Sequence, residues 1–334
     1  MCKDFWKIMT RLNDSLHIVL IDSFSGIIPP PFAGNLERMW FGLLKGKGTH
    51  QISVASCRGS FLEHPLADGI FRPNSFKALK DHLKGFDLLI VPSNLDWIIG
   101  GMRYKFEVCL REICSLDVQV AVLGQVATDQ NVCALVRSNL ELLTTKAKRV
   151  KVVRHCSHLK KSSLSVDERT VVMLGGVTQW SIEVAAKACQ FLGRQLFVIG
   201  RHDLESAYGA VMLGEINEAR KADLISQASA CVYVKHPQAK PLGSPSLLEP
   251  GICGTPTIAL DYGGPSTVSE YLGDSLILKE GTSGETTIQT LGSALKDLHV
   301  DRMSLQQQTS ELYSCQAFTQ NVLDAVFDDH SMWD

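Results

Sequence analysis

The residues best suited to chemistry lie in the segment Pro241–Glu270. Ser244 belongs to a residue type that caps helices, and Pro245 after it suits the first helical position. A helix that begins there presents free backbone N–H groups at Ser246 and Leu247. Such groups, together with the positive end of the helix dipole, bind anions and typically phosphate. The pattern therefore predicts an anion-binding helix N-terminus, with an ordinary loop connection as the alternative interpretation.

Glu249 lies about one turn inside the same predicted helix. From that position a carboxylate could accept two hydrogen bonds from a ribose diol. Gly254 and Pro256 follow as stop signals for the helix. Gly263 and Gly264 then form a turn at the carboxyl end of the next predicted strand, where ligands bind in open α/β sheets. These residues predict a ligand that combines phosphate with a sugar.

Other predicted strand ends carry further candidates. Gly176 and Arg201 follow two strands of the second half, and His236, Lys240 and Gly243 lie in the loop after a third. Arg201 and Lys240 are the cations that would contact a diphosphate, and His236 would face the same ligand. The alternative interpretation places these side chains on solvated surface turns.

These residues need a scaffold, and the chain supplies short apolar runs that alternate with amphipathic segments. Such alternation indicates βαβ units and parallel sheets with helices on both faces. Strands are predicted at residues 16–21, 51–55, 88–91, 118–123, 149–153, 170–174, 196–199, 230–234, 257–260 and 276–278. Helices are predicted at residues 36–44, 75–83, 104–113, 131–143, 181–191, 221–227, 246–253 and 265–271, with more helix to about residue 327.

A polar segment, His155–Arg169, interrupts this alternation and is typical of a domain boundary. We therefore predict a Rossmann-like domain over residues 1–160 and a second over residues 161–334. The terminal helices are candidates to pack back on the first domain. A length of 334 residues fits two domains of ordinary size.

The composition is that of a globular protein, with 45% hydrophobic and 20% charged residues and a net charge of −2. This charge gives no global basic field for nucleic acid. No apolar run reaches the ~18–20 residues of a membrane span. The N-terminus lacks the apolar core of a signal peptide, so we expect a cytoplasmic protein. Ten scattered cysteines without a Cys-x-x-Cys pair indicate reduced thiols rather than a disulfide scaffold or metal site.

The segment Lys146–Lys161 is the local exception to this charge balance, because it holds seven lysine and arginine residues. A solvated surface is one interpretation. Contact with an anionic surface or polymer, such as membrane headgroups or nucleic acid, is the other. Nothing aromatic is interleaved, which argues against base stacking.

The segment LLEPGICGTPTIALDYGGPSTVSE, which ends at Glu270, resembles the donor-binding segment of the family-4-type retaining glycosyltransferases (glycosyl transferases group 1). Their GT-B architecture consists of two Rossmann-like α/β domains that face each other across a cleft. The resemblance extends over most of residues 170–278. Glu249 matches the second glutamate of the family pattern, which holds the donor ribose. Further matches are Gly254, Pro256, Gly263, Gly264 and Glu270.

The N-terminal half resembles the same family more weakly. Pro29–Pro31, Gly34 and Glu37–Arg38 are similar to the loop that approaches the donor phosphate and the acceptor, although Asn35 replaces one glycine. The resemblance implies that Glu37 and Arg38, together with Lys240, lie at the catalytic centre. The alternative is a proline-rich loop before a solvated Glu–Arg pair on a helix.

Departures from the family pattern concern the chemistry. Its first glutamate falls on Pro241, or on Lys240 if one residue is inserted. The Arg and Lys that hold the diphosphate are absent from Gly175–Ser181, and the acceptor-side His is absent after the strand at residues 118–123. Loss of a charged clamp costs several kcal/mol of transition-state stabilisation.

The resemblance implies a nucleotide-sugar-dependent glycosyltransferase of the hexosyltransferase type, which acts with retention and without a protein nucleophile. No metal or cofactor is expected, because no Asp-x-Asp motif follows a strand. The departures keep open a catalytically silent GT-B-like binding or regulatory subunit, and an epimerase of the same architecture. The sequence does not indicate the sugar, the base, the acceptor or the oligomeric state.

Overall fold

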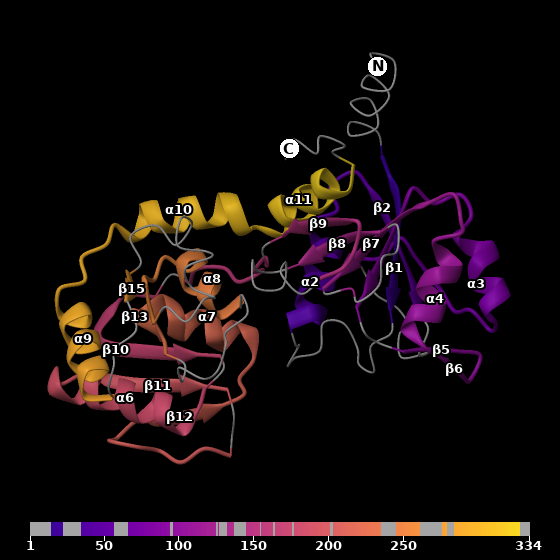
Figure 1. Cartoon of the computed structure of the whole chain (residues 1–334). Coiled ribbons are helices and arrows are strands. Elements are labelled where there is room, and N and C mark those ends of the chain that lie inside the picture. Colours follow the sequence, from indigo (N-terminus) through magenta and orange to yellow (C-terminus); the bar gives the residue numbers. More distant parts are fainter. Residues whose placement is uncertain are drawn as a thin grey trace. The chain divides into compact units, whose positions relative to one another are not determined.

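The computed structural model describes most of the chain as two compact units (Figure 1). The first unit combines residues 1–154 with residues 315–334, and the second consists of residues 155–314. The described residues are 15–22, 35–56, 66–93, 96–124, 126, 132–136, 145–153, 155–162, 164–175, 177–200, 203–234, 245–260, 276–278 and 284–327.

The first unit is built on a parallel sheet of seven described strands, in the order β3-β2-β1-β4-β7-β8-β9. From β1 the chain adds β2 and β3 on one side of the sheet and then β4 and the later strands on the other side, so the strand order reverses between β1 and β4. Residues of β4 and β8 are buried at every position, as expected of strands covered on both faces. The strands are β1 (His17–Asp22), β2 (Gln51–Ser56), β3 (Gly69–Phe71), β4 (Leu88–Pro92), β7 (Gln119–Leu123), β8 (Cys133–Val136) and β9 (Arg149–Val152).

The helices of this unit follow from local signals. Ser75 caps α3 (Phe76–Leu83) by accepting a hydrogen bond of 3.1 Å from the Ala78 N–H, and the apolar face of α3 is buried. A short antiparallel hairpin of β5 (Trp97–Ile99) and β6 (Met102–Tyr104) precedes α4 (Phe106–Ile113). Earlier in the chain lies α2 (Asn35–Lys45).

The prediction of a helix at residues 131–143 is wrong for the described part of that range, because Cys133–Val136 forms strand β8. All four of its residues are buried. A continuous apolar run of this kind does not distinguish a buried strand from part of a buried helix. Pairing with β7 and β9 decides the outcome in favour of the strand.

The helix α11 (Cys315–Phe327), yellow in Figure 1, belongs to the first unit and packs against α2 and β8. Arg149 of β9 donates a hydrogen bond of 3.1 Å to the Val326 carbonyl of this helix. The approach to the end of α2 is close, because a Cβ at Gly46 would meet the carbonyl of Cys315 and lie 2.7 Å from Thr319 Oγ1. Glycine at position 46 therefore allows α11 to pack against α2.

The second unit is built on a parallel sheet of six described strands, in the order β12-β11-β10-β13-β14-β15. Its order reverses between β10 and β13. The strands are β10 (Asp167–Leu174), β11 (Gln195–Ile199), β12 (Val211–Gly214), β13 (Ala228–Tyr233), β14 (Thr257–Leu260) and β15 (Leu276–Leu278).

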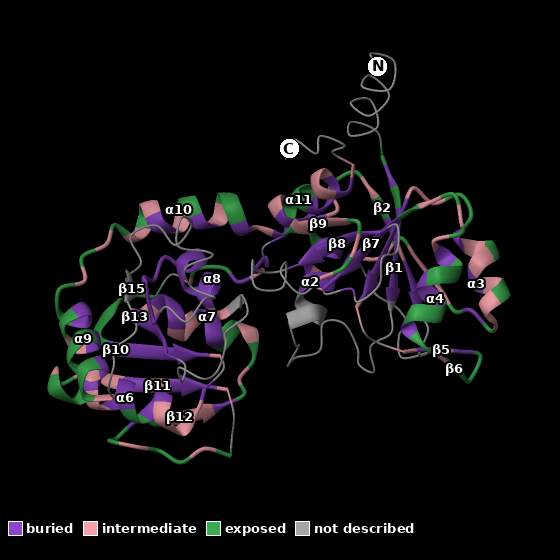
Figure 2. Ribbon diagram, viewed as in Figure 1, coloured by how far each residue is buried: buried purple, intermediate pink, exposed green. Residues whose placement is uncertain are grey.

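Helices cover both faces of this sheet, which Figure 2 shows as buried strands between helices with exposed outer sides. Alternate residues of β10 enter different apolar clusters: Val171 and Met173 pack with residues of α6, whereas Val172 and Leu174 pack with residues of α7. α6 also packs on α9, and α8 packs on α10. The helices are α6 (Gln179–Phe191), α7 (Glu218–Gln227), α8 (Pro245–Ile252), α9 (Gly284–Lys296) and α10 (Arg302–Tyr313). The predicted fold class of two Rossmann-like α/β units is confirmed.

Arg302 holds the start of α10 against the ends of α7 and α8. Its guanidinium donates hydrogen bonds of 2.7 Å to the Ala228 carbonyl, 2.9 Å to the Ser226 carbonyl and 2.6 Å to Thr255 Oγ1. Thr255 Oγ1 in turn donates one of 2.6 Å to the Ile225 carbonyl. The predicted left-handed stop of α8 is confirmed at Gly254, where φ is +74°.

The eight cysteines within the described residues form no disulfide, and all except Cys114 are buried. Burial raises the pKa of Cys109, Cys189 and Cys253 to about 12, so each remains a neutral thiol at physiological pH. They act as small apolar core residues. Among the described helices, none combines the length and apolar character of a membrane span.

Candidate functional site

The candidate site lies at the carboxyl edge of the second sheet, where α7 and α8 begin. In a parallel βαβ unit the helix starts near the carboxyl end of the preceding strand, here β12 for α7 and β13 for α8. Lys221 is in the first turn of α7, and Glu249 is one turn inside α8. The edge also includes the end of β10, so the reversal of strand order between β10 and β13 lies in the same place. Open α/β sheets bind ligands at such reversal points.

Lys221 and Glu249 form a buried ion pair. Lys221 Nζ lies 3.0 Å from Glu249 Oε1, with 5% and 4% of the two side chains exposed. The ammonium also lies 2.8 Å from Glu218 Oε2, and His158 Nε2 lies 3.7 Å from that same oxygen. Burial of a charge is costly unless a counter-charge accompanies it. Lys221 supplies that counter-charge to Glu249, while Lys221 itself has both Glu249 and Glu218 beside it. Lys221 therefore holds one oxygen of the Glu249 carboxylate in place.

Lys221 is a functional candidate that the sequence analysis missed. It appears there only as the first residue of a predicted helix. The available signal is its spacing, because Ile225, four residues on, lies on the same buried face of α7. A lysine on an apolar helix face predicts an acidic partner, but the partner is 28 residues away and belongs to another helix.

The structure places the start of α8 at Pro245, so Ser246 and Leu247 lie in its first turn as predicted. Ser246 is partly buried. The side chain of Leu247 is fully buried in an apolar cluster with Tyr233, Ile252 and Tyr313. Any contact of Leu247 with a ligand would therefore use its backbone N–H group.

Most of the other predicted site residues lie outside the described residues. These are Gly176, Arg201, His236, Lys240, Gly243, Gly263 and Gly264. Glu37 and Arg38 lie in α2, but their side chains are also outside the description. The roles predicted for these residues remain predictions.

The helix α6 begins at the same edge, after β10. Thr178 caps it through a reciprocal capping box, in which its hydroxyl accepts from the Ser181 N–H at 3.2 Å. No lysine, arginine or histidine is present among residues 177–181, so the departure from the family pattern at this position stands. An anion there would rely on the helix N-terminus rather than on a side-chain cation.

The basic segment Lys146–Lys161 contains both exposed and buried residues. Lys146 and Lys148 are exposed in the first unit, and Lys160 and Lys161 are exposed in the second. Arg149 is bonded to the Val326 carbonyl. Within the described residues, no group of three or more His, Cys, Asp or Glu could hold a metal ion.

The comparison with known proteins gives no match to any family model and no match to any curated protein. Solved structures do match over almost the whole chain. They include AviGT4, a glycosyltransferase involved in avilamycin A biosynthesis, at 14% identity and a TM-score of 0.62, over 93% of this chain and 97% of that one. A glycosyltransferase from Rickettsia africae ESF-5 matches at 11% identity and a TM-score of 0.64, over 95% and 100%.

HepE from Anabaena, solved in complex with UDP, matches at 10% identity and a TM-score of 0.63, over 94% of this chain and 100% of that chain. The structural neighbours are GT-B glycosyltransferases of the group 1 type. At these identities the similarity establishes the fold, and the expected fold class of two Rossmann-like α/β units is thereby confirmed.

Proposed function

We propose that this protein is a nucleotide-sugar-dependent glycosyltransferase whose donor binds at the carboxyl edge of the second sheet. The observation that carries the proposal is the position of Glu249, one turn inside α8 beside the reversal of strand order and held there by Lys221. The neighbours that share the fold include a glycosyltransferase solved with UDP. The fold and the position of Glu249 thus both favour a nucleotide-sugar as the ligand.

The ion pair has an electrostatic consequence for such a donor. A lone carboxylate close to a bound diphosphate would repel it, because two like charges at short range interact strongly in a partly buried site. The ammonium of Lys221, 3.0 Å from Glu249, offsets this negative charge. Glu249 can then accept hydrogen bonds from ribose hydroxyls while the N-terminal N–H groups of α8 face the phosphates.

The finer proposal is a hexosyl transfer with retention, in the cytoplasm, without a metal or other cofactor. The leaving diphosphate would help to deprotonate the acceptor, so the protein supplies positioning and electrostatic stabilisation rather than a nucleophile. Glu37, Arg38 and Lys240 are the residues that we assign to the reacting centre, and the other predicted donor contacts join Glu249.

A catalytically silent nucleotide-sugar-binding protein is the second candidate. It is favoured by the absence of a cation in residues 177–181, which start α6 at the end of β10. Without a charged clamp on the leaving diphosphate, binding can persist while the transition state loses several kcal/mol of stabilisation.

Thermal unfolding in the presence of nucleotides tests both candidates. UDP, GDP, ADP, CMP and their sugar conjugates are each added to the wild type, to Glu249→Gln and to Glu285→Gln, an exposed control on α9. A ligand at about 100 times its dissociation constant stabilises the native state by ~2.7 kcal/mol. We expect one nucleotide to raise the melting temperature of the wild type and the control but not of Glu249→Gln.

The same samples are then assayed for hydrolysis of the donor. Slow hydrolysis supports the transferase, whereas binding without turnover supports the silent protein. A failure of every nucleotide to shift the wild-type melting temperature contradicts both.

A further inference from the structure

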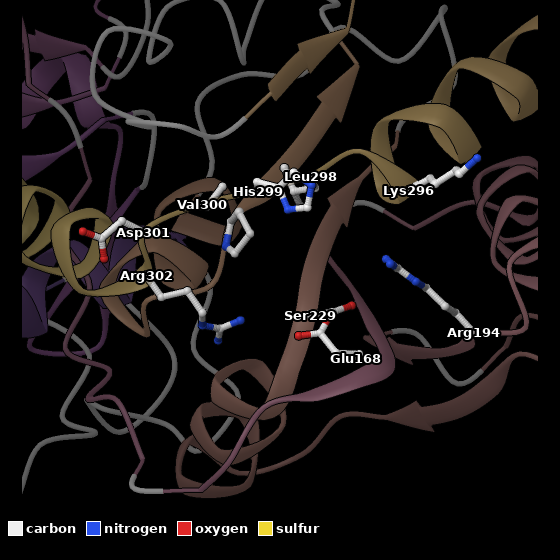
Figure 3. A pocket seen from close by; sticks show the side chains of 10 residues that line it. Glu168, Arg194, Ser229, Lys296, Leu298, His299, Val300, Asp301 and Arg302 are labelled. Carbon is white, nitrogen blue, oxygen red and sulfur yellow. The ribbon is translucent and has the colours of Figure 1, made fainter.

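A pocket of about 640 Å³ lies at the amino edge of the second sheet, the opposite edge from Glu249 (Figure 3). Its lining includes Glu168 at the start of β10, Arg194 just before β11 and Ser229 at the start of β13. The end of α9, the start of α10 and the connection between them supply most of the rest, and Pro256 lies just before β14. Parallel strands all begin at this edge, so the pocket is separate from the candidate donor site.

The charges of the pocket are unbalanced. Four basic side chains line it, from Arg194, Lys296, His299 and Arg302, against the acidic side chains of Glu168 and Asp301. The Asp301 carboxylate caps α10, where it accepts a hydrogen bond of 3.0 Å from the Met303 N–H.

The basic side chains of the pocket form no ion pair with an acidic side chain in the described part of the chain. Those of Arg194, Lys296 and His299 form no hydrogen bond or ion pair there. Arg302 donates hydrogen bonds only to two carbonyls and one hydroxyl, and the carboxylate of Glu168 acts on its charge from a distance. Its guanidinium is partly buried, and this burial lowers its pKa. An anion in the pocket would add negative charge beside these cations.

Figure 3 shows how these side chains are aimed. The guanidinium ends of Arg194 and Arg302 point into the pocket from opposite sides, and in this view the carboxylate of Glu168 lies between them. The remaining walls include the apolar side chains of Leu298 and Val300. The pocket thus combines cations at its sides, the Glu168 carboxylate between two of them and apolar side chains in its wall.

We propose that this pocket binds a small phosphate monoester that carries hydroxyl groups, which is the chemistry of a sugar phosphate. The guanidinium of Arg194 binds the phosphate through charge-assisted hydrogen bonds, and His299 and Arg302 contribute further contacts to it. Glu168 accepts hydrogen bonds from the hydroxyl groups. The volume lies in the range of about 300–1,000 Å³ that small-molecule sites occupy.

A polymeric anion fits this pocket less well. The cations line a recess rather than a ridge or a flat face, and the central carboxylate of Glu168 would repel a phosphate backbone. If the ligand carries hydroxyl groups, this carboxylate can accept hydrogen bonds from them, which offsets its repulsion of the phosphate. The inference does not depend on the proposed transferase activity, because the pocket uses none of the donor-site residues.

Isothermal titration calorimetry of the full chain, without any nucleotide present, tests the proposal. The probes are glucose 6-phosphate, glucose 1-phosphate, ribose 5-phosphate and glycerol 3-phosphate, with inorganic phosphate and glucose for comparison. We expect saturable binding of at least one phosphate ester, weaker binding of inorganic phosphate and none of glucose.

Variants assign the binding to the pocket. Arg194→Gln should weaken the binding of both the ester and inorganic phosphate about tenfold, as expected for the loss of a hydrogen bond to a charged group. Glu168→Gln should weaken the ester but not inorganic phosphate. Arg111→Gln, the same exchange at an exposed position of the first unit, should change neither.

Three results would overturn the proposal. One is the absence of saturable binding for every ester at millimolar concentration. Another is an equal loss in Arg194→Gln and Arg111→Gln, which would indicate nonspecific charge attraction. The third is a loss of ester binding in Glu249→Gln, which would place the ligand at the opposite edge of the sheet.

Discussion

The ammonium of Lys221 lies 3.0 Å from Oε1 of Glu249, and both side chains are almost fully buried. One residue comes from the first turn of α7 and the other from α8, so a single ion pair ties together two helices that begin at the same edge of the sheet. The pair thereby links the stability of the second unit to the orientation of its best candidate for donor binding.

Lys221→Met should destabilise the protein by about 3–5 kcal/mol, because the variant leaves the Glu249 carboxylate buried without its counter-charge. Glu249→Gln should destabilise it by less, because the Lys221 ammonium keeps the Glu218 carboxylate 2.8 Å away as a counter-charge. Urea denaturation followed by circular dichroism gives both free energies of unfolding.

The double variant Lys221→Met/Glu249→Leu should recover most of this loss, because it removes both buried charges together. A cost of Lys221→Met below about 1 kcal/mol, the range of exposed ion pairs, would contradict the burial of the pair.

Thr255→Val should cost about 1–3 kcal/mol, although the two side chains have the same shape. The hydroxyl donates to the Ile225 carbonyl and accepts from Arg302, both at 2.6 Å, and valine removes both of these hydrogen bonds. Thr290→Val is the matched control, since its exposed hydroxyl donates to the Thr286 carbonyl within α9. Similar costs for the two variants in urea denaturation would speak against the Arg302 anchor.

Gly46→Ala should destabilise the first unit by about 1–3 kcal/mol, because the added methyl group collides with the start of α11. Gly292→Ala is the opposite case. It lies in α9 with nothing within 4 Å of the added Cβ, so the better helix propensity of alanine should stabilise by about 0.5–1 kcal/mol. Thermal unfolding measures both changes, with a lower melting temperature expected for Gly46→Ala and a higher one for Gly292→Ala. Equal changes in melting temperature would refute the close approach of α11.

Cys189 should make the protein sensitive to alkaline pH. Burial raises the pKa of its thiol from 9.0 to about 12 in the folded state, so the unfolded chain ionises first. The stabilising contribution is complete below pH ~9 and is lost as the pH rises toward about 12, with a slope of at most ~1.4 kcal/mol per pH unit. The free energy of unfolding should fall more steeply above pH 9 in the wild type than in Cys189→Ala, and equal slopes would exclude this role for the thiol.

Strong local patterns predicted most of the described elements. The apolar runs of β4 and β14 and the start of α8 at Pro245 agree with the structure, and Gly254 adopts the left-handed conformation expected of a helix stop. The hairpin of β5 and β6 was not predicted, because its three-residue strands are too short to show a period. The strand β8 was assigned as helix for the reason given above.

The candidate site was predictable in part. Glu249 follows from a helix-start pattern, which is local in sequence. Its partner Lys221 does not, because pairing across 28 residues depends on how α7 and α8 pack against the sheet. The same applies to Arg302, whose three acceptors lie 47 to 76 residues away in the chain. Tertiary contacts of this kind leave no periodic signal.

The assignment of α11 to the first unit has a consequence for synthesis on the ribosome. Domains generally fold as they emerge, with the N-terminal one first. Here residues 155–314, the whole second unit, are translated between β9 and α11. Until α11 emerges, the surfaces of α2 and β8 that it covers have no native partner in the nascent chain. The first unit, although begun earlier, therefore completes its native core only after the second unit has been translated.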